Sequence, residues 1–127
     1  MLKSISTIMR YSNNPIEQKS FEFSLKIIEV YKSMTNQRVY VLSKQLLRSG
    51  TSVGANIQEA QAAYSKKDFA NKMSISSKEA RETKYWLLLV KYGGLVDLDL
   101  DSLISQNDEL IKMLTAIVKT SQFNNKN

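Results

Sequence analysis

The sequence predicts an all-α protein, an antiparallel up-down-up-down four-helix bundle. Its 127 residues include only one proline and four glycines, so turns are few and the elements between them must be long. Lys, Glu, Gln, Leu and Ala are common, and all five favour helices. Four segments of about 20 residues repeat apolar residues at spacings of three and four, which is the helical period. Because short turns join these segments, neighbouring helices are expected to run antiparallel within one domain.

The first helix is predicted at residues 15–34. Asn14 can cap it, Pro15 suits its first position, and Glu17 lies in its first turn. The residues before it, 1–14, are polar and mixed, and we expect them to form a flexible N-terminal arm. The apolar stripe of this helix consists of Ile16, Phe23, Ile27, Val30 and Met34, widened by Phe21, Leu25 and Ile28.

The second helix is predicted at residues 39–62, after a turn at 35–37. Gly50 and Gly54 within it each cost about 1 kcal/mol relative to alanine in a helix. Close approach of another helix backbone would offset that cost, and the alternative is a kink or break near these glycines. The apolar stripe runs without interruption through Val39, Leu42, Leu46, Gly50, Val53, Ile57 and Ala60.

The third helix is predicted at residues 66–92, where Ser65 and Asp68 resemble a capping box. Its stripe consists of Phe69, Met73, Ser76, Ala80, Thr83, Leu87 and Val90. Further large apolar residues in its C-terminal half lie outside that stripe, so this half should be buried on more than one side. A monomer this small can hardly provide such burial. We therefore expect an oligomer interface whose candidate residues are Tyr85, Trp86, Leu88 and Leu89.

The fourth helix is predicted at residues 100–121. Gly93 and Gly94 end the helix before it. Asp97, Asp99 and Asp101 lie near its start, where negative charge complements the helix dipole. The apolar residues are Leu100, Leu103, Ile104, Leu110, Ile111, Leu114, Ile117 and Val118. Residues 122–127 are expected to form a polar tail.

The composition excludes most catalytic chemistry. The chain has no cysteine, hence no disulfide, thiol nucleophile or cysteine-ligated metal, and no histidine, the commonest general base. We expect no enzyme activity, no metal and no cofactor, although a site built from carboxylates alone stays open. The start lacks the long apolar run of a signal peptide, and the apolar stretches are too short to span a bilayer. The expected compartment is the cytoplasm.

A row of polar residues follows one side of the second predicted helix at spacings of four, four and three: Arg48, Ser52, Asn56 and Glu59. If the next turn centres near residue 64, antiparallel packing predicts the charge pairs Arg48–Glu82 and Glu59–Lys72. One interpretation is a buried or half-buried network that sets helix register. The alternatives are direct contact with a ligand, or a cluster of Glu59, Glu79 and Glu82 that acts alone or holds a metal.

The net charge of +6 is concentrated in residues 32–91, which hold eleven Lys or Arg and four acids. Such a segment can contact a polyanion, and the alternative is an ordinary solvated face. No zinc finger, RNA-recognition or helix-turn-helix motif makes the signal specific. Tyr64, beside Lys66 and Lys67, could stack on a base, although such a tyrosine more often packs at a helix end. The candidate nucleic-acid contacts are Lys44, Lys66, Lys67, Lys72, Lys78, Arg81 and Lys84.

Two runs of residues carry a resemblance to a known family. The first is Arg48-Ser49-x-x-Ser52-Val53-x-x-Asn56-Ile57-x-Glu59. The second is Ser65-x-x-Asp68-Phe69-x-x-Lys72-Met73 followed by Lys78-Glu79-Ala80-x-Glu82-Thr83-x-Tyr85-Trp86-Leu87. Together with the Gly93-Gly94-Leu95 turn, they resemble the bacterial four-helix bundle proteins also called 23S rRNA intervening-sequence proteins. Ala60 departs from the pattern, because a glycine often follows the glutamate there.

The resemblance implies a four-helix bundle that assembles into a ring-like homo-pentamer. The accessory proteins of diversity-generating retroelements, which bind nucleic acid, are similar to this family. No catalytic residues carry over, and the molecular function of the family is largely unassigned. The signature positions, which the resemblance implies are structural, are Arg48, Ser52, Asn56, Glu59 and Glu82. We expect a non-enzymatic oligomeric binding protein that contacts RNA or DNA through its basic face. The alternative is a protein-interaction scaffold with no nucleic-acid role.

Overall fold

The computed structural model describes residues 12–126, and the side chains of residues 12–123. Within this range the chain forms four helices and no strand, which confirms the predicted all-α class. The helices are α2 (Pro15–Asn36), α3 (Val41–Ala60), α4 (Lys66–Gly93) and α5 (Asp101–Lys126). None of the helices formed by these residues is long and apolar enough to cross a membrane.

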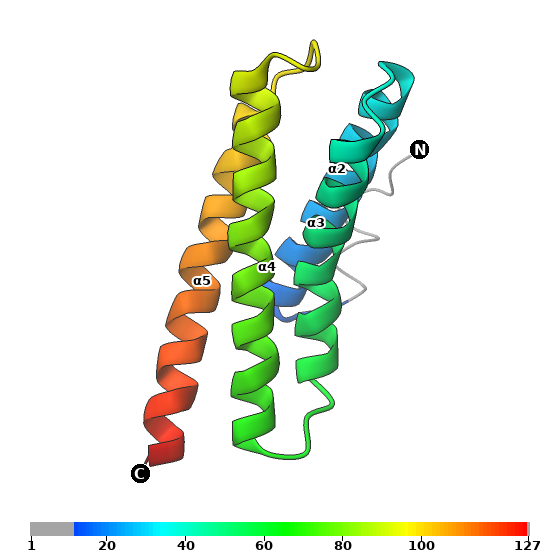
Figure 1. Ribbon diagram of the computed structural model, residues 1–127. Coiled ribbons are helices and arrows are strands. Elements are labelled where there is room, and N and C mark those ends of the chain that lie inside the picture. Colours follow the sequence, from blue (N-terminus) through cyan, green and yellow to red (C-terminus); the bar gives the residue numbers. More distant parts are fainter. Residues whose placement is uncertain (1–11, 127) are drawn as a thin grey trace.

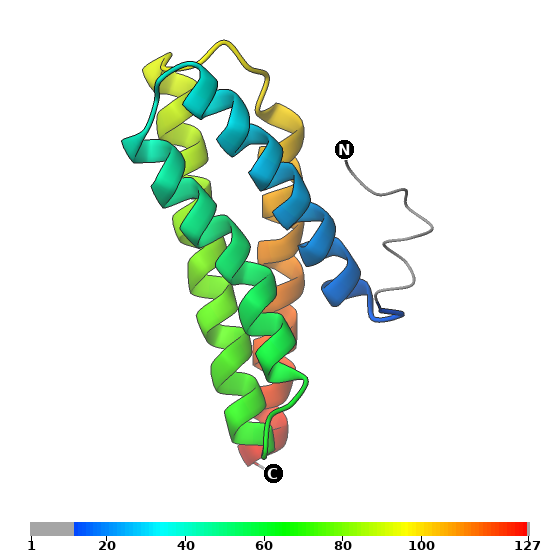
Figure 2. The same ribbon diagram turned by 90° about the vertical axis from the view of Figure 1, so that its right-hand side faces the viewer.

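Successive helices run in opposite directions along a shared long axis (Figure 1). α3 packs between α2 and α4, α4 packs between α3 and α5, and α2 touches α5 only lightly. The turned view in Figure 2 shows the start of α2 diverging from the other three helices. The core is one apolar cluster from all four helices, whose largest fully buried members are Phe23, Ile27, Met34, Leu46, Ile57, Met73, Leu87, Leu110 and Leu114.

Side-chain caps define the helix starts that the sequence predicts. The Asn14 side chain accepts a hydrogen bond from the Ile16 amide at 3.1 Å, and Ser65 accepts one from the Asp68 amide at 3.0 Å. Ser12 donates to Glu17 and accepts from the Asn14 amide. The predicted flexible arm at 1–14 is therefore wrong for residues 12–14, which are hydrogen-bonded to the first turn of α2. Residues 1–11 lie outside the described part of the chain.

The turn between α2 and α3 contains a residue in the left-handed conformation, Arg38, with φ of 67°. Its amide donates to the Thr35 carbonyl, and the Val39 amide donates to the Met34 carbonyl at 2.9 Å. This pair of bonds is a Schellman ending of α2. α3 then begins at Val41, two residues later than predicted, because the residues of this ending are not available to a new helix.

The two glycines of α3 lie where α2 comes close. A Cβ atom at Gly50 would be 2.7 Å from Cγ1 of Ile27, and one at Gly54 would be 3.4 Å from the Ser20 carbonyl oxygen. α3 continues without a break from Val41 to Ala60. Close approach of α2 therefore explains Gly50, whereas a Cβ at Gly54 would make ordinary contacts, and the alternative of a helix break is wrong.

The last helix is longer than the sequence suggests. α5 extends to Lys126, so the polar tail predicted at 122–127 is wrong as far as that residue. The physical reason is that residues 119–126 contain neither glycine nor proline, and nothing interrupts the backbone hydrogen bonds. Loss of apolar periodicity alone does not end a helix.

Candidate functional site

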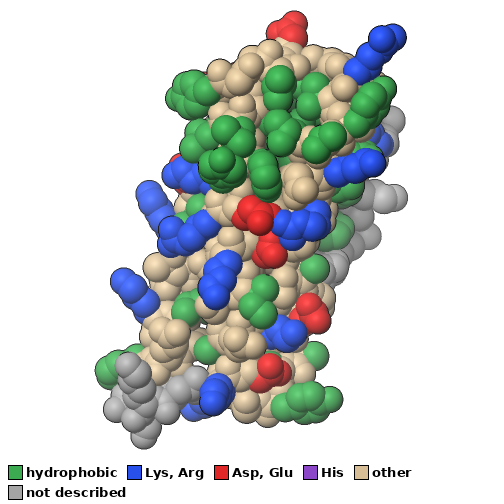
Figure 3. Space-filling model, in the orientation of Figure 1, with side chains coloured by type: hydrophobic (Ala, Val, Ile, Leu, Met, Phe, Trp, Pro, Cys, Tyr) green, Lys and Arg blue, Asp and Glu red, His purple; other side chains and the backbone are tan. Residues whose placement is uncertain are grey.

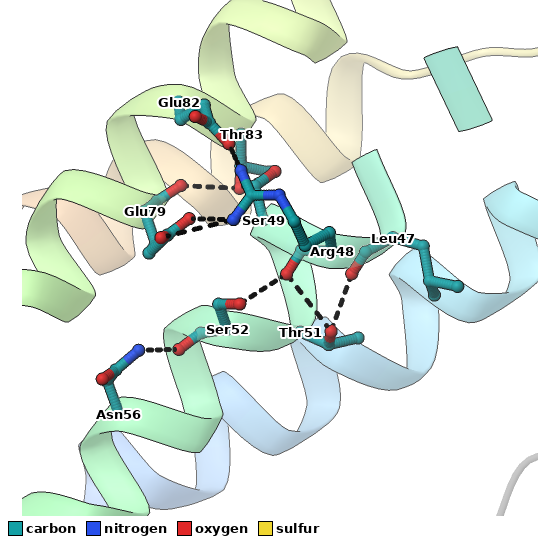
Figure 4. A network of polar contacts seen from close by, with 9 residues as sticks. All are labelled: Leu47, Arg48, Ser49, Thr51, Ser52, Asn56, Glu79, Glu82 and Thr83. Carbon is teal, nitrogen blue, oxygen red and sulfur yellow. Dashed lines mark hydrogen bonds and ion pairs between the residues drawn. The ribbon is translucent and has the colours of Figure 1, made fainter. Parts of the chain in front are cut away.

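The polar row of α3 faces α4 at its upper end. Arg48 Nη1 lies 3.2 Å from Glu79 Oε2, and its other nitrogen, Nη2, forms an ion pair with Glu82 (Figure 4). Further down, Lys72 Nζ lies 3.8 Å from Glu59 Oε1. Both charge pairs predicted from antiparallel geometry are therefore present, and Glu79 joins the first of them.

The middle of the row does not reach α4. Ser52 donates to the Arg48 carbonyl at 2.6 Å, and Asn56 donates to the Ser52 carbonyl at 2.8 Å, so both side chains bond the backbone of their own helix (Figure 4). The side chains of Arg48 and Glu82 are 50% and 41% exposed. The row is thus a half-exposed edge of the α3–α4 contact rather than a buried network.

The buried polar contacts between helices come from residues outside the polar row, two of which belong to a predicted apolar stripe. The hydroxyls of Thr83 and Ser49 are hydrogen-bonded at 2.9 Å, and Ser76 donates to the Val53 carbonyl at 2.7 Å. Thr83 and Ser76 were in the predicted stripe of the third helix, and their hydroxyls were the available signal. One more contact joins α5 to α4 where Asn107 donates to the Ala80 carbonyl at 3.0 Å.

The three acids of the possible carboxylate site are all engaged in ion pairs with basic residues. Glu79 and Glu82 pair with Arg48, and Glu59 pairs with Lys72. Among the described residues, no group of three or more Asp or Glu side chains is placed to hold a metal ion.

The candidate basic residues divide into two groups. Lys72 and Lys84 form ion pairs, with Glu59 and, at 2.9 Å, with Asp108. The others on α4 are exposed and have no carboxylate partner within residues 12–123: Lys66, Lys67, Lys78 and Arg81. We call these four residues the basic stripe. Arg81 also donates to the Thr115 hydroxyl at 3.3 Å, and Lys44 is exposed on α3.

An exposed apolar surface occupies the opposite end of the same helix. Hydrophobic side chains gather there over the end of α4 and the start of α3, and Lys and Arg side chains lie below them (Figure 3). We call the exposed members the apolar patch: Tyr40, Val41, Tyr85, Leu89 and Tyr92. Of the predicted interface residues, Tyr85 and Leu89 belong to it, at 58% and 39% exposure.

The remaining predicted interface residues lie beneath this surface. Leu88 is half-buried, and Trp86 packs against the core with its ring edge-to-face to that of Tyr85, 5.3 Å between centroids. The Trp86 indole nitrogen is buried and has no hydrogen-bond partner in the described chain. A buried donor without a partner is uncommon in a finished interior.

Comparison with known proteins matches this architecture. A solved structure from Bacteroides thetaiotaomicron VPI-5482, described as a protein with unknown function from the S23 ribosomal protein family, is 45% identical to this chain. The similarity covers 82% of this chain and 98% of that one, with a TM-score of 0.76. No curated protein sequence matches this chain. Residues 12–116, which span α2, α3, α4 and most of α5, match the 23S rRNA-intervening sequence proteins, and the chain belongs to that family.

Proposed function

We propose that this protein is a non-catalytic, homo-oligomeric binding protein that contacts nucleic acid through the basic stripe of α4. The observation that carries the proposal is the arrangement of charge on that helix. Its exposed outer face presents Lys66, Lys67, Lys78 and Arg81 without a carboxylate partner among the described residues. A nucleic-acid partner would place the protein in the cytoplasm.

The acids of α4 support this assignment by their positions. Glu79 and Glu82 are drawn toward α3 by Arg48, so their charge is partly neutralised at the α3–α4 edge. The outer face keeps its positive charge as a result. Basic residues concentrated on one face attract phosphates and release the counterions condensed on them.

The apolar patch supports self-association. Tyr85 and Tyr92 are 58% and 76% exposed, and a partner's apolar surface would remove them and Leu89 from water. The resemblance noted in the sequence implies a ring-like homo-pentamer. The patch adjoins the basic stripe where Arg81 and Tyr85 lie four residues apart on α4, so association through the patch would leave the other end of the stripe, at Lys66 and Lys67, open. Light scattering coupled to size exclusion should give a lower mass for Leu89→Lys than for the wild type.

Salt dependence of binding tests the nucleic-acid assignment. Fluorescence anisotropy with labelled RNA and DNA should give affinities that fall steeply with salt. Lys78→Gln/Arg81→Gln should reduce the slope of log affinity against log salt by about 1.4–1.8, the value for two phosphate contacts. Lys32→Gln, at an exposed lysine of α2, is the matched control and should keep the wild-type slope. Absent or salt-insensitive binding at low salt would remove this function.

The second candidate is a protein-interaction scaffold with no nucleic-acid role, favoured by the exposed apolar side chains of the apolar patch. This candidate requires that the apolar patch remain exposed in the oligomer and bind another protein. A protein partner captured from nuclease-treated lysate by the wild type, and lost with Leu89→Lys while the oligomeric mass stays unchanged, would favour the scaffold.

A further inference from the structure

Tyr64 is a large aromatic side chain that the fold leaves outside its core. It lies in the turn between α3 and α4, and its side chain is fully exposed. Within the described residues the ring makes no hydrogen bond, ion pair or aromatic contact. The expectation that a tyrosine here packs at a helix end is therefore wrong, and stability of the bundle does not explain this residue.

The surroundings of Tyr64 are concave and positively charged. Tyr64, Lys66 and Phe69 line an open depression of about 560 Å³, together with Ala60 of α3 and Ser121 of α5. Lys66 and Lys67 are exposed, and Asp68 is the acid nearest to them in sequence. The site combines an aromatic face with cations, the pairing typical of proteins that bind single-stranded nucleic acid.

The depression is also continuous with the basic stripe. Lys66 belongs to both, and α4 runs from this turn upward through Lys78 to Arg81 (Figure 1). From Lys67 to Arg81 the helix rises about 21 Å, at 1.5 Å per residue. At the rise of about 3.4 Å per phosphate of one strand in B-DNA, that length corresponds to about six nucleotides, and a more extended single strand would place fewer along it. Its end would reach Tyr64.

We propose that Tyr64 stacks on an unpaired base of a single-stranded nucleic acid whose adjacent phosphates are bound by Lys66 and Lys67. This inference rests on the proposed nucleic-acid function and adds a preference for single strands over duplex. In a duplex the bases are stacked on one another, so the Tyr64 ring would find no free base face except at the ends.

The experiment compares the wild type with Tyr64→Ala and Tyr64→Phe, using 12-nucleotide oligouridine, oligothymidine and a duplex of equal length. Tyr64→Ala should weaken binding of the single strands by about 5- to 150-fold, the effect of losing one base–aromatic stack. Tyr64→Phe keeps the ring and should bind nearly as the wild type. The slope of log affinity against log salt concentration should be unchanged in both Tyr64 variants, because neither alters charge. The double variant Lys66→Gln/Lys67→Gln should reduce that slope.

An abasic oligonucleotide separates stacking from charge. Without bases to stack on, the wild type and Tyr64→Ala should bind it equally. If Tyr64→Ala weakens the abasic or duplex probe as much as the intact single strand, stacking is overturned. If the wild type binds with the expected salt dependence and Tyr64→Ala matches it on every probe, the Tyr64 site is wrong and the basic stripe stands. If the wild type binds no probe, both proposals fall.

Discussion

The hydroxyl groups of Thr83 and Ser49 lie 2.9 Å apart on the buried face between α3 and α4, joined by a hydrogen bond. Both side chains are fully buried, and Thr83 also bonds the Glu79 carbonyl within its own helix. Thr83 therefore keeps one hydrogen bond when the Ser49 hydroxyl is removed, whereas Ser49 loses its hydrogen bond when the Thr83 hydroxyl is removed. That asymmetry gives the first prediction.

Thr83→Val should destabilise the protein by about 1–3 kcal/mol, because the isosteric change leaves the Ser49 hydroxyl buried without a partner. Ser49→Ala should cost less, since Thr83 keeps its bond to Glu79. The double variant should be more stable than Thr83→Val alone, because no orphaned hydroxyl remains. Urea denaturation of the three variants measures this order, and a double variant less stable than both single ones would contradict it.

The two glycines of α3 should respond to alanine in opposite directions. At Gly50 the new Cβ would be 2.7 Å from Cγ1 of Ile27, and the overpacking cost of about 1–3 kcal/mol outweighs a helix-propensity gain of about 1 kcal/mol. At Gly54 the nearest atoms are 3.4 Å away, so Gly54→Ala should raise stability by up to about 1 kcal/mol. Thermal melting compares the two, and equal shifts would show that the approach of α2 does not matter.

Arg38→Gly should stabilise the fold. Arg38 has a φ of 67°, where a side chain costs about 1–2 kcal/mol and glycine does not. Some of this gain is lost because glycine makes the unfolded chain more flexible, so we expect a net increase of about 1 kcal/mol or less. Arg38→Ala keeps the Cβ atom and is the control for loss of charge. A similar gain from both variants would assign the effect to charge.

The ion pair of Arg48 with Glu82 should have a small coupling energy. Both side chains are close to half exposed, and pairs of this kind contribute about 0.2–1 kcal/mol. A double-mutant cycle with Arg48→Gln and Glu82→Gln measures the coupling, which should shrink in high salt. Lys26 and Glu29, 4.0 Å apart on α2, form a comparison pair within one helix. A coupling energy of zero would mean that the register of α3 against α4 depends on the buried hydrogen bonds and not on this ion pair.

The pair of Lys91 with Asp101 should appear in a pH titration. The hydrogen bond that Lys91 donates to the Asp101 carboxylate, 2.7 Å away, raises the pKa of Lys91 above its ordinary value of 10.5. A raised pKa means that the pair contributes fully below pH 10.5 and loses its contribution as the pH rises through the higher value. In Asp101→Asn the NMR titration midpoint of Lys91 should fall back toward 10.5. Asp108→Asn, which removes the partner of Lys84, should leave it unchanged.

The sequence predicted the architecture wherever one residue type has one common use. Asn14 and Ser65 cap helices as expected, and Gly94, with φ of 63°, ends α4. The pairing of Arg48 with Glu82 followed from the position of a single turn, because antiparallel register is then determined. These features depend on local chemistry and on helix period, both of which are written in consecutive residues.

Other features depend on contacts between distant residues and could not be read in the same way. A serine or threonine in an apolar stripe can either pack against apolar neighbours or form a buried hydrogen bond. At Thr83 the second holds, because α3 brings Ser49 within hydrogen-bonding distance. Arg38 is a poor marker for a left-handed helix ending, so the start of α3 was misplaced. The exposure of Tyr64 likewise depends on how the whole turn projects from the bundle.

The uneven packing of α2 has a consequence for how the molecule opens. α2 lies along α3 but touches α5 lightly, and within residues 12–123 the ion pair that joins α2 to α5 is Lys19 with Glu109. α3, α4 and α5 are additionally linked by buried hydroxyl and amide contacts. Local unfolding begins where the fewest contacts must break. Amide protons of α2 should therefore exchange with solvent through partial openings that leave a three-helix remainder folded.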